Sequence, residues 1–195
     1  MNIMDSPSRD SAPRSPYDKT GGLVYFGRML DKIRSHARSE LPDAYVVNLG
    51  KGFDEKCTTF LRVSYELVVE YVHAGLPDEA ILESCFAMGR QPSEAEIYMW
   101  NEFMRKRGWH DEVSEMLESQ KKREAMLSRS EIQTMFQFMD ADEGRLVNDN
   151  FAKGACVRKR IAIPAKEWPA RPEDKDMLDP SRGVGLPIDQ RRLIV

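Results

Sequence analysis

The sequence contains no long hydrophobic run. Its apolar stretches are only a few residues long, as in Leu67–Val69, so no segment is predicted to span a membrane. The N-terminal stretch is polar and contains prolines but no apolar core, which does not fit a secretory signal. Cysteine is scarce: the chain has three, without a CxxC pair, and an odd number favours a reducing compartment. We therefore expect a cytoplasmic protein.

Motifs for metal binding and catalysis are also missing. The three histidines, His36, His73 and His110, lie far apart and have no metal-ligand spacing around them. There is no GxSxG motif, and no cysteine belongs to a recognisable set with His and Asp. The sequence therefore predicts no metal and no cofactor, and it contains no recognisable catalytic motif.

Basic residues are concentrated near the C-terminal end. Residues 145–195 contain 11 Lys and Arg against 7 Asp and Glu, a balance of +4, whereas residues 1–144 contain 18 against 25, a balance of −7. An acidic body argues against nucleic-acid binding, which needs clustered basic side chains. The basic tail could still contact an acidic partner.

The middle of the chain has helical periodicity. Apolar residues from Leu23 to Ala37 recur at helical spacing over about four turns. Later segments have typical start signals, such as Ser64 as an N-cap and Ser93 with Glu96 as a capping box. A long charged helix is predicted over 112–127 and a shorter one from Ser130 onward. No strand pattern stands out in 22–143, so we predict an all-α, compact bundle of six or seven short helices.

Both ends of the chain differ from this body. Residues 1–20 read as an extended N-terminal arm, residues 21–144 as the helical domain, and residues 145–195 as an irregular, proline-rich C-terminal tail. Within the tail, 157–163 could form an edge strand. The tail also carries apolar residues that a disordered segment seldom needs, namely Trp168, Leu186, Ile188 and Leu193–Val195. It could dock on its own body or on another chain, and composition does not separate the two.

The stretch Asn48–Asp54, NLGKGFD, resembles a phosphate-binding loop at first sight. A Walker loop would need glycine where Tyr45 stands and a hydroxyl where Gly52 stands, so that reading fails. Two alternatives remain. The glycines could let backbone N–H groups cup an anion around Lys51, or the stretch could simply start a helix, with Phe53 packed inward and Asp54 as the N-cap.

Charged side chains form a second stripe on the first predicted helix. Arg28, Asp31 and Lys32 lie on one face, and Arg38 extends it by a turn. The stripe is either a solvated face or a cationic wall that lines a groove for a carboxylate or phosphate. Trp100 and the neighbouring Asn101 could line a pocket, although an aromatic residue at helical spacing more often belongs to the core.

Acidic residues end the last predicted helix. Asp140, Asp142 and Glu143 do not form a calcium loop, because the required glycine and the final glutamate are missing. Carboxylates at a helix C-terminus lie at the negative end of its dipole and need cations nearby. We expect them to pair with Arg145, with Lys51 or with the cations of the first helix.

Four ordered segments resemble a known family. They are GGLVYFGRMLDKIR, NLGKGFD, PSEAEIYMWNEFMRKRGW and FMDADEGR, and the resemblance covers about residues 11–145. They are similar to an uncharacterised bacterial family known only as a domain of unknown function. The resemblance implies a helical fold in the cytoplasm and no assigned activity, and the tail after Arg145 is not part of it.

Two functions are compatible with these observations. The first is a non-catalytic interaction or accessory protein that binds a larger protein assembly through residues 1–20 and 145–195. The second is a small-anion binding protein or an enzyme with a pocket lined by Arg28, Lys32 and Lys51. Under either hypothesis, the candidate binding residues are Arg28, Asp31, Lys32, Arg38, Lys51, Asp54, Asn101, Asp140, Asp142, Glu143 and Arg145.

Overall fold

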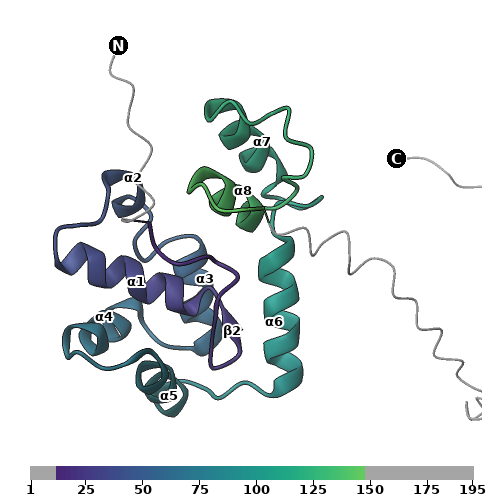
Figure 1. Ribbon diagram of the computed structural model, residues 1–195. Coiled ribbons are helices and arrows are strands. Elements are labelled where there is room, and N and C mark those ends of the chain that lie inside the picture. The colour runs from purple at the N-terminus through teal and green to yellow at the C-terminus, as the bar shows by residue number, and fades with distance from the viewer. Residues whose placement is uncertain (1–11, 148–195) are drawn as a thin grey trace, which may run out of the picture. The chain divides into compact units, whose positions relative to one another are not determined.

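The computed structural model describes residues 12–147, and these are mostly helical (Figure 1). The helices are α1 (Phe26–Ala37), α2 (Asp43–Val46), α3 (Phe53–Leu61), α4 (Tyr65–His73), α5 (Asp78–Met88), α6 (Glu94–Lys106), α7 (Ser114–Arg123) and α8 (Met135–Asp142). The all-α prediction is therefore confirmed. The described residues hold one helix more than the six or seven expected, because α2 is a single turn that periodicity cannot detect.

Local capping explains where several helices begin. Ser64 accepts a hydrogen bond from the backbone of Leu67, and Ser93 forms the predicted capping box with Glu96. The predicted start of the last helix at Ser130 is wrong, because Thr134 and Gln137 form a second capping box that starts α8 at Met135.

The predicted helix over 112–127 is too long at both ends. Before it, the Asp111 carboxylate accepts hydrogen bonds from the backbone of Gly108 and Val113 and so holds a turn. After it, Ala125 adopts a positive φ of 55°, which a continuing right-handed helix does not allow. Helix α7 is therefore confined to Ser114–Arg123.

A small hairpin precedes α1, where a longer helix was expected. Strands β1 (Lys19–Thr20) and β2 (Leu23–Val24) pair antiparallel, so the prediction that the helix begins at Leu23 is wrong. Asn101 on α6 holds this hairpin: its Oδ1 accepts from the backbone N–H of Val24 at 3.0 Å, and its Nδ2 donates to the Gly22 carbonyl at 2.8 Å. The two hydrogen bonds from Asn101 satisfy backbone groups that would otherwise have needed partners within a helix.

Two clusters of apolar side chains form the core. The larger joins β2, α1, α3, α4, α5 and α6, with Phe26, Met29 and Leu30 of α1 completely buried. The smaller joins α7 and α8 around Leu117 and Ile132. Helices α7 and α8 lie together at one end of α6, and α8 contacts α6 (Figure 1).

Residues 12–20 lie against this core, although they were predicted to belong to an extended arm. Tyr17 packs edge-on against Phe136 of α8, with ring centroids 5.3 Å apart. Residues 1–11 and 148–195 lie outside the described residues, and so do the predicted strand at 157–163 and the docking of the tail. Within 12–147, no helix is long and apolar enough to cross a bilayer.

Candidate functional site

A buried ion pair joins the first and last helices. Arg28 on α1 is 3% exposed, and its guanidinium donates through both terminal nitrogens to the carboxylate of Glu143, just after α8; the Nη1–Oε2 distance is 2.9 Å. The Tyr45 hydroxyl donates to the same carboxylate at 2.8 Å. The expected pairing of the acidic residues with the first helix is thus present, and it neutralises charge at the negative end of the α8 dipole.

Arg145 extends this pair toward the N-terminal segment. Its guanidinium pairs with Asp140 at 2.7 Å and with Glu143. It also donates to the Pro13 carbonyl at 3.2 Å, and Arg28 donates to the same carbonyl at 3.3 Å. One backbone oxygen near the start of the described residues is therefore shared by arginines from α1 and from the segment after α8.

Three further contacts fix residues 14 and 15. The Ser15 hydroxyl donates to Asp140 at 2.9 Å. Arg14 pairs with Asp31 of α1 at 2.6 Å and with Asp78 of α5 at 2.8 Å. The hydrogen bond to Asp31 is the main reason that the pKa of Arg14 lies above its ordinary value. We call residues 13–15 together with Arg28, Asp140, Glu143 and Arg145 the terminal junction.

A second buried cluster lies on the same helix. Lys32 Nζ is 2.6 Å from Asp54 Oδ1, and Asp54 is completely buried. The Tyr25 hydroxyl donates to the same oxygen at 3.0 Å and accepts from Lys32 at 3.2 Å. Burial lowers the pKa of Lys32, against the opposing effect of the Asp54 carboxylate, and burial also raises the pKa of Tyr25.

The loop NLGKGFD closes over this second cluster. Gly50 and Gly52 have positive φ values of 69° and 58°, and Gly52 is the N-cap of α3, so the prediction of Asp54 as the N-cap is wrong. Asp54 instead points inward and accepts from the Gly50 N–H at 3.1 Å. Lys51 N–H donates to the Asn48 carbonyl. These two amide groups are engaged within the loop, which matches the helix-start alternative.

The other candidate residues lie apart from these clusters. Arg38 pairs with Glu40 on the surface, and Lys51 is exposed and forms no ion pair with another residue of 12–147. Asn101 holds the hairpin, as described above. Asp142 is half-buried, and that burial raises the pKa of its carboxyl group. The structure thus groups several candidate residues into two neighbouring sets that both include side chains of α1, namely Arg28, Asp31, Lys32, Asp54, Asp140, Glu143 and Arg145.

Some members of these sets could not be found by sequence reasoning. Tyr25 and Tyr45 supply hydroxyl groups, and nothing in the pattern around either of them signals this. Arg14 and Asp78 contribute from segments that are far apart in the chain. The terminal junction joins residues more than a hundred positions apart in the chain, and local periodicity in the sequence cannot predict such a contact.

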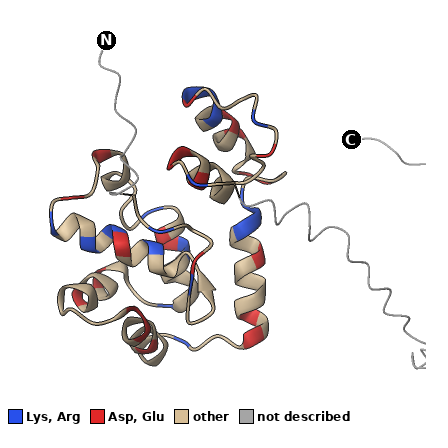
Figure 2. Cartoon of the chain, in the orientation of Figure 1, with Lys and Arg blue, Asp and Glu red and all other residues tan. Residues whose placement is uncertain are grey.

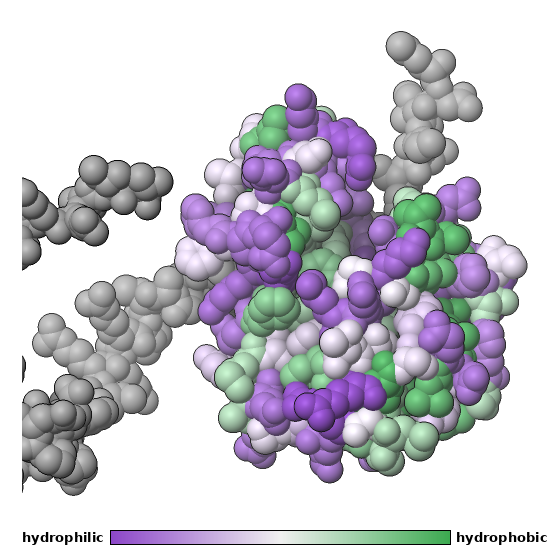
Figure 3. All heavy atoms as spheres, turned by 180° about the vertical axis from the view of Figure 1, so that it is seen from behind, coloured by the Kyte–Doolittle hydropathy of each residue, from purple (hydrophilic) through white to green (hydrophobic). Residues whose placement is uncertain are grey.

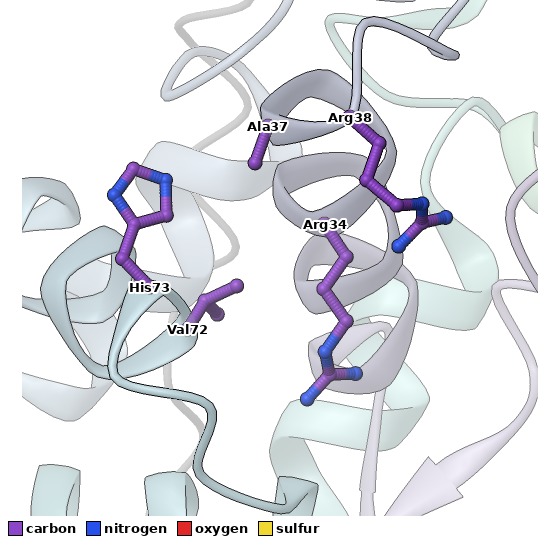
Figure 4. A pocket seen from close by; sticks show the side chains of 5 residues that line it. All are labelled: Arg34, Ala37, Arg38, Val72 and His73. Carbon is purple, nitrogen blue, oxygen red and sulfur yellow. The ribbon is translucent and has the colours of Figure 1, made fainter.

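The cations of the first-helix stripe are divided between the core and the surface. Figure 2 shows charges of both signs along α1, and Arg28 and Lys32 are already buried against carboxylates. A shallow pocket of about 430 Å³ lies between α1 and α4, lined by Arg34, Ala37, Arg38, Val72 and His73. Figure 4 shows the guanidinium groups of Arg34 and Arg38 pointing away from the His73 ring.

Both arginines of this pocket already have carboxylate partners. Arg34 is 2.6 Å from Asp78, and Arg38 is 2.6 Å from Glu40. An anion would have to compete with these carboxylates, so the pocket is poorly suited to bind one. In the part of the chain that the structure describes, no three His, Cys, Asp or Glu side chains are placed to hold a metal ion.

The fold and the contacts define a class of protein: a small helical domain in which a buried ion pair joins α1 to the end of α8, and hydrogen bonds join residues 13–15 to Asp140 and Arg145. The chain belongs to the family described as "Domain of unknown function (DUF5069)", whose model matches residues 10–145. A search of curated proteins finds no match. The matched range begins three residues before Pro13 and ends at Arg145, so it contains the whole terminal junction.

Proposed function

We propose that this protein is a non-catalytic interaction or accessory protein of the bacterial cytoplasm. It binds a larger protein assembly through the chain on either side of the domain, residues 1–20 and 145–195. The observation that carries the proposal is the shared Pro13 carbonyl, which accepts hydrogen bonds from both Arg28 and Arg145. Because of these bonds, residues 13 and 145 lie side by side.

Exposed apolar residues near the terminal junction support this proposal. Val47 is 65% exposed and Leu146 is 94% exposed. Val47 directly follows α2, whose Tyr45 reaches Glu143 of the terminal junction, and Leu146 directly follows Arg145. Apolar side chains beside the starting points of both segments would add contact area for a partner that both segments reach.

The alternative function is a small-anion binding protein or enzyme. It required Arg28, Lys32 and Lys51 to line one pocket. Arg28 and Lys32 are each 3% exposed and paired with different carboxylates, whereas Lys51 lies on the surface. The geometry therefore favours the interaction hypothesis.

Affinity capture with quantitative mass spectrometry tests the proposal. The bait is the tagged full chain, expressed in the cells that naturally produce it, beside variants lacking residues 1–11 or 148–195. We expect one protein partner to be enriched by the full chain and reduced in both deletions. The reduction should be roughly a hundredfold in affinity, because two tethered segments raise each other's effective concentration.

The control is Tyr98→Ala, which removes an exposed side chain of α6 outside the terminal junction. This variant should capture the same partner as the full chain. If both deletions capture the same proteins in the same amounts as the full chain, the proposal is wrong. A capture that depends on the domain alone would contradict it equally.

A further inference from the structure

Apolar side chains on the surface lie in separate patches bordered by polar ones, as on the face shown in Figure 3. Helix α6 exposes two apolar side chains four positions apart: Met99 is 60% exposed and Phe103 is 45% exposed. Phe103 also lines an open, shallow pocket of about 380 Å³ between α3 and α6. The other lining residues of this pocket are Glu55, Lys56, Thr59, Phe60 and Trp100. Exposed apolar side chains beside such a hollow are typical of an interaction surface.

Charged side chains of opposite sign flank these two residues along α6. Glu96 lies three positions before Met99, and its side chain is 36% exposed. Lys106 lies three positions after Phe103, and its side chain is 47% exposed. Figure 2 shows the acidic start and the basic end of this helix. The four residues are spaced three, four and three positions apart, which is the spacing of one seam along a helix, and we call them the α6 seam.

The α6 seam is complementary to itself in the reverse direction. Positions 96 and 106 have their midpoint at residue 101, and so do positions 99 and 103. An antiparallel pair of copies, related by a two-fold axis at this midpoint, places Glu96 opposite Lys106 of the second copy and Met99 opposite Phe103 of the second copy. A parallel pair would instead place each charge opposite its own kind, and like charges repel. The order of the four residues therefore favours the antiparallel arrangement.

Both charged groups of the α6 seam have room for a further partner. The Glu96 carboxylate accepts one hydrogen bond from Arg90 and two from Ser93, and a carboxylate has about four acceptor sites. The Lys106 Nζ is 2.9 Å from Glu102, and an ammonium group has three donors. An ion pair between two copies can therefore form while the contacts within each copy remain.

We propose that two copies of this chain associate antiparallel through the α6 seam. Met99 of each copy then lies beside Phe103 of the other, next to the pocket between α3 and α6, and methionine adapts well to such irregular hollows. Helix α6 has 13 residues and is about 20 Å long, so the contact is smaller than those of stable complexes. We expect a dissociation constant on the order of tens of micromolar. The contact does not depend on the proposed function, which uses the chain on either side of the domain.

Sedimentation equilibrium of the purified full chain tests the association. We expect the mass to rise from that of one chain toward that of two as the concentration reaches about ten times the expected dissociation constant. Met99→Ala should raise the dissociation constant about tenfold, because the symmetry removes this side chain from both halves of the contact. The matched control is Tyr98→Ala. Tyr98 is 67% exposed on the same helix but points about 100° away from Met99, so its removal should leave the constant unchanged.

A charge reversal tests the relative direction of the two helices. Lys106→Glu places a carboxylate opposite Glu96 in both halves of an antiparallel dimer, and at low salt it should raise the dissociation constant about tenfold. In a parallel dimer, the same variant would exchange one like-charged pair for another and change little. Lys122→Glu, at an exposed position of α7, alters the net charge equally and should have no such effect.

Photo-crosslinking identifies the contact directly. p-Benzoylphenylalanine replaces Phe103 in one preparation of the full chain, which is mixed with an isotopically heavy full chain that carries no replacement. After irradiation, we expect position 103 to be crosslinked to a heavy peptide that contains Met99. The same group at position 98 should give no such crosslink.

Several results would overturn the proposal. They are a chain that stays monomeric throughout the concentration series, equal dissociation constants for Met99→Ala and Tyr98→Ala, and an unchanged constant for Lys106→Glu. Crosslinks from position 103 to another part of the second copy, or to no second copy, would overturn it as well. Because these experiments use the purified protein alone, their outcome is separate from that of the partner capture.

Discussion

Removal of one charge from the Lys32–Asp54 pair should destabilise the protein strongly. The two side chains are 4% and 0% exposed, and Asp54→Ala leaves the Lys32 ammonium in the core without its carboxylate. The loss of one partner of a buried ion pair costs about 3–5 kcal/mol. In a domain of this size, that corresponds to a fall in melting temperature of roughly 6–20 °C.

The surface offers a matched ion pair of the same length. Arg38 and Glu40 are also 2.6 Å apart, but they are 56% and 58% exposed. Glu40→Ala should therefore cost no more than about 1 kcal/mol, because exposed pairs gain little from an attraction that water screens. The two alanine variants separate the effect of burial from that of distance.

Removal of both buried charges should cost less than removal of one. The double variant Lys32→Met with Asp54→Leu places two apolar side chains where the ion pair was, and such exchanges are often nearly neutral. The Tyr25 hydroxyl loses both partners in this variant, at a cost of about 1–3 kcal/mol. A further Tyr25→Phe exchange should recover part of that loss.

Urea unfolding of the full chain, followed by circular dichroism, measures these differences. We expect the unfolding free energy to fall most for Asp54→Ala, less for the double variant and least for Glu40→Ala. If Asp54→Ala costs no more than Glu40→Ala, burial of the pair does not determine its contribution. If the double variant is less stable than Asp54→Ala, the isolated buried ammonium is not the source of the cost.

Two more substitutions test local features of the fold. Asn101→Ala should lower the unfolding free energy by about 2–3 kcal/mol, because the Val24 N–H and the Gly22 carbonyl lose their partners. The control Tyr98→Ala on the same helix should change the unfolding free energy by less than about 0.5 kcal/mol. Similar urea midpoints for the two variants would contradict the role of Asn101 in holding the hairpin. The second substitution, at Glu96, tests a dependence of stability on pH. Hydrogen bonds from the Ser93 backbone and from Arg90 lower the pKa of the Glu96 carboxyl group from 4.5 to about 2. The contribution of Glu96 to stability is therefore present above pH 4.5 and is lost as the pH falls toward 2. Glu96→Gln should therefore flatten the fall in melting temperature over that range, and parallel curves for the two proteins would refute the assignment.

Local features of the fold could be predicted from the sequence. The Ser93–Glu96 capping box needs only two residues three positions apart, and the structure contains it. The apolar stripe of α1 was also correct from Phe26 to Ile33, because helical spacing indicates which side chains face the core, whereas Ala37 at the end of the predicted stripe is exposed. The same stripe misled the prediction at Leu23, since the hairpin there depends on Asn101, which lies 77 residues away from Val24.

The charged clusters were predictable only in part. The rule that carboxylates at a helix C-terminus need cations indicated that Glu143 would find a basic partner. It could not choose Arg28 over Lys51, because that choice depends on how α1 and α8 pack. Nor could it show that Lys32 and Asp54 are buried, since Lys32 lies on a stripe that reads equally well as a solvated face.

The shared Pro13 carbonyl has a consequence for how this domain can be rearranged. Residues 13 and 145 are joined by a hydrogen bond, so the domain starts and stops at one place. A short linker could therefore connect residue 147 to residue 12, and new ends could be opened in an exposed connection such as the one between α4 and α5. Domains of this kind tolerate circular permutation and insertion into a loop of a host protein, because neither requires their ends to separate.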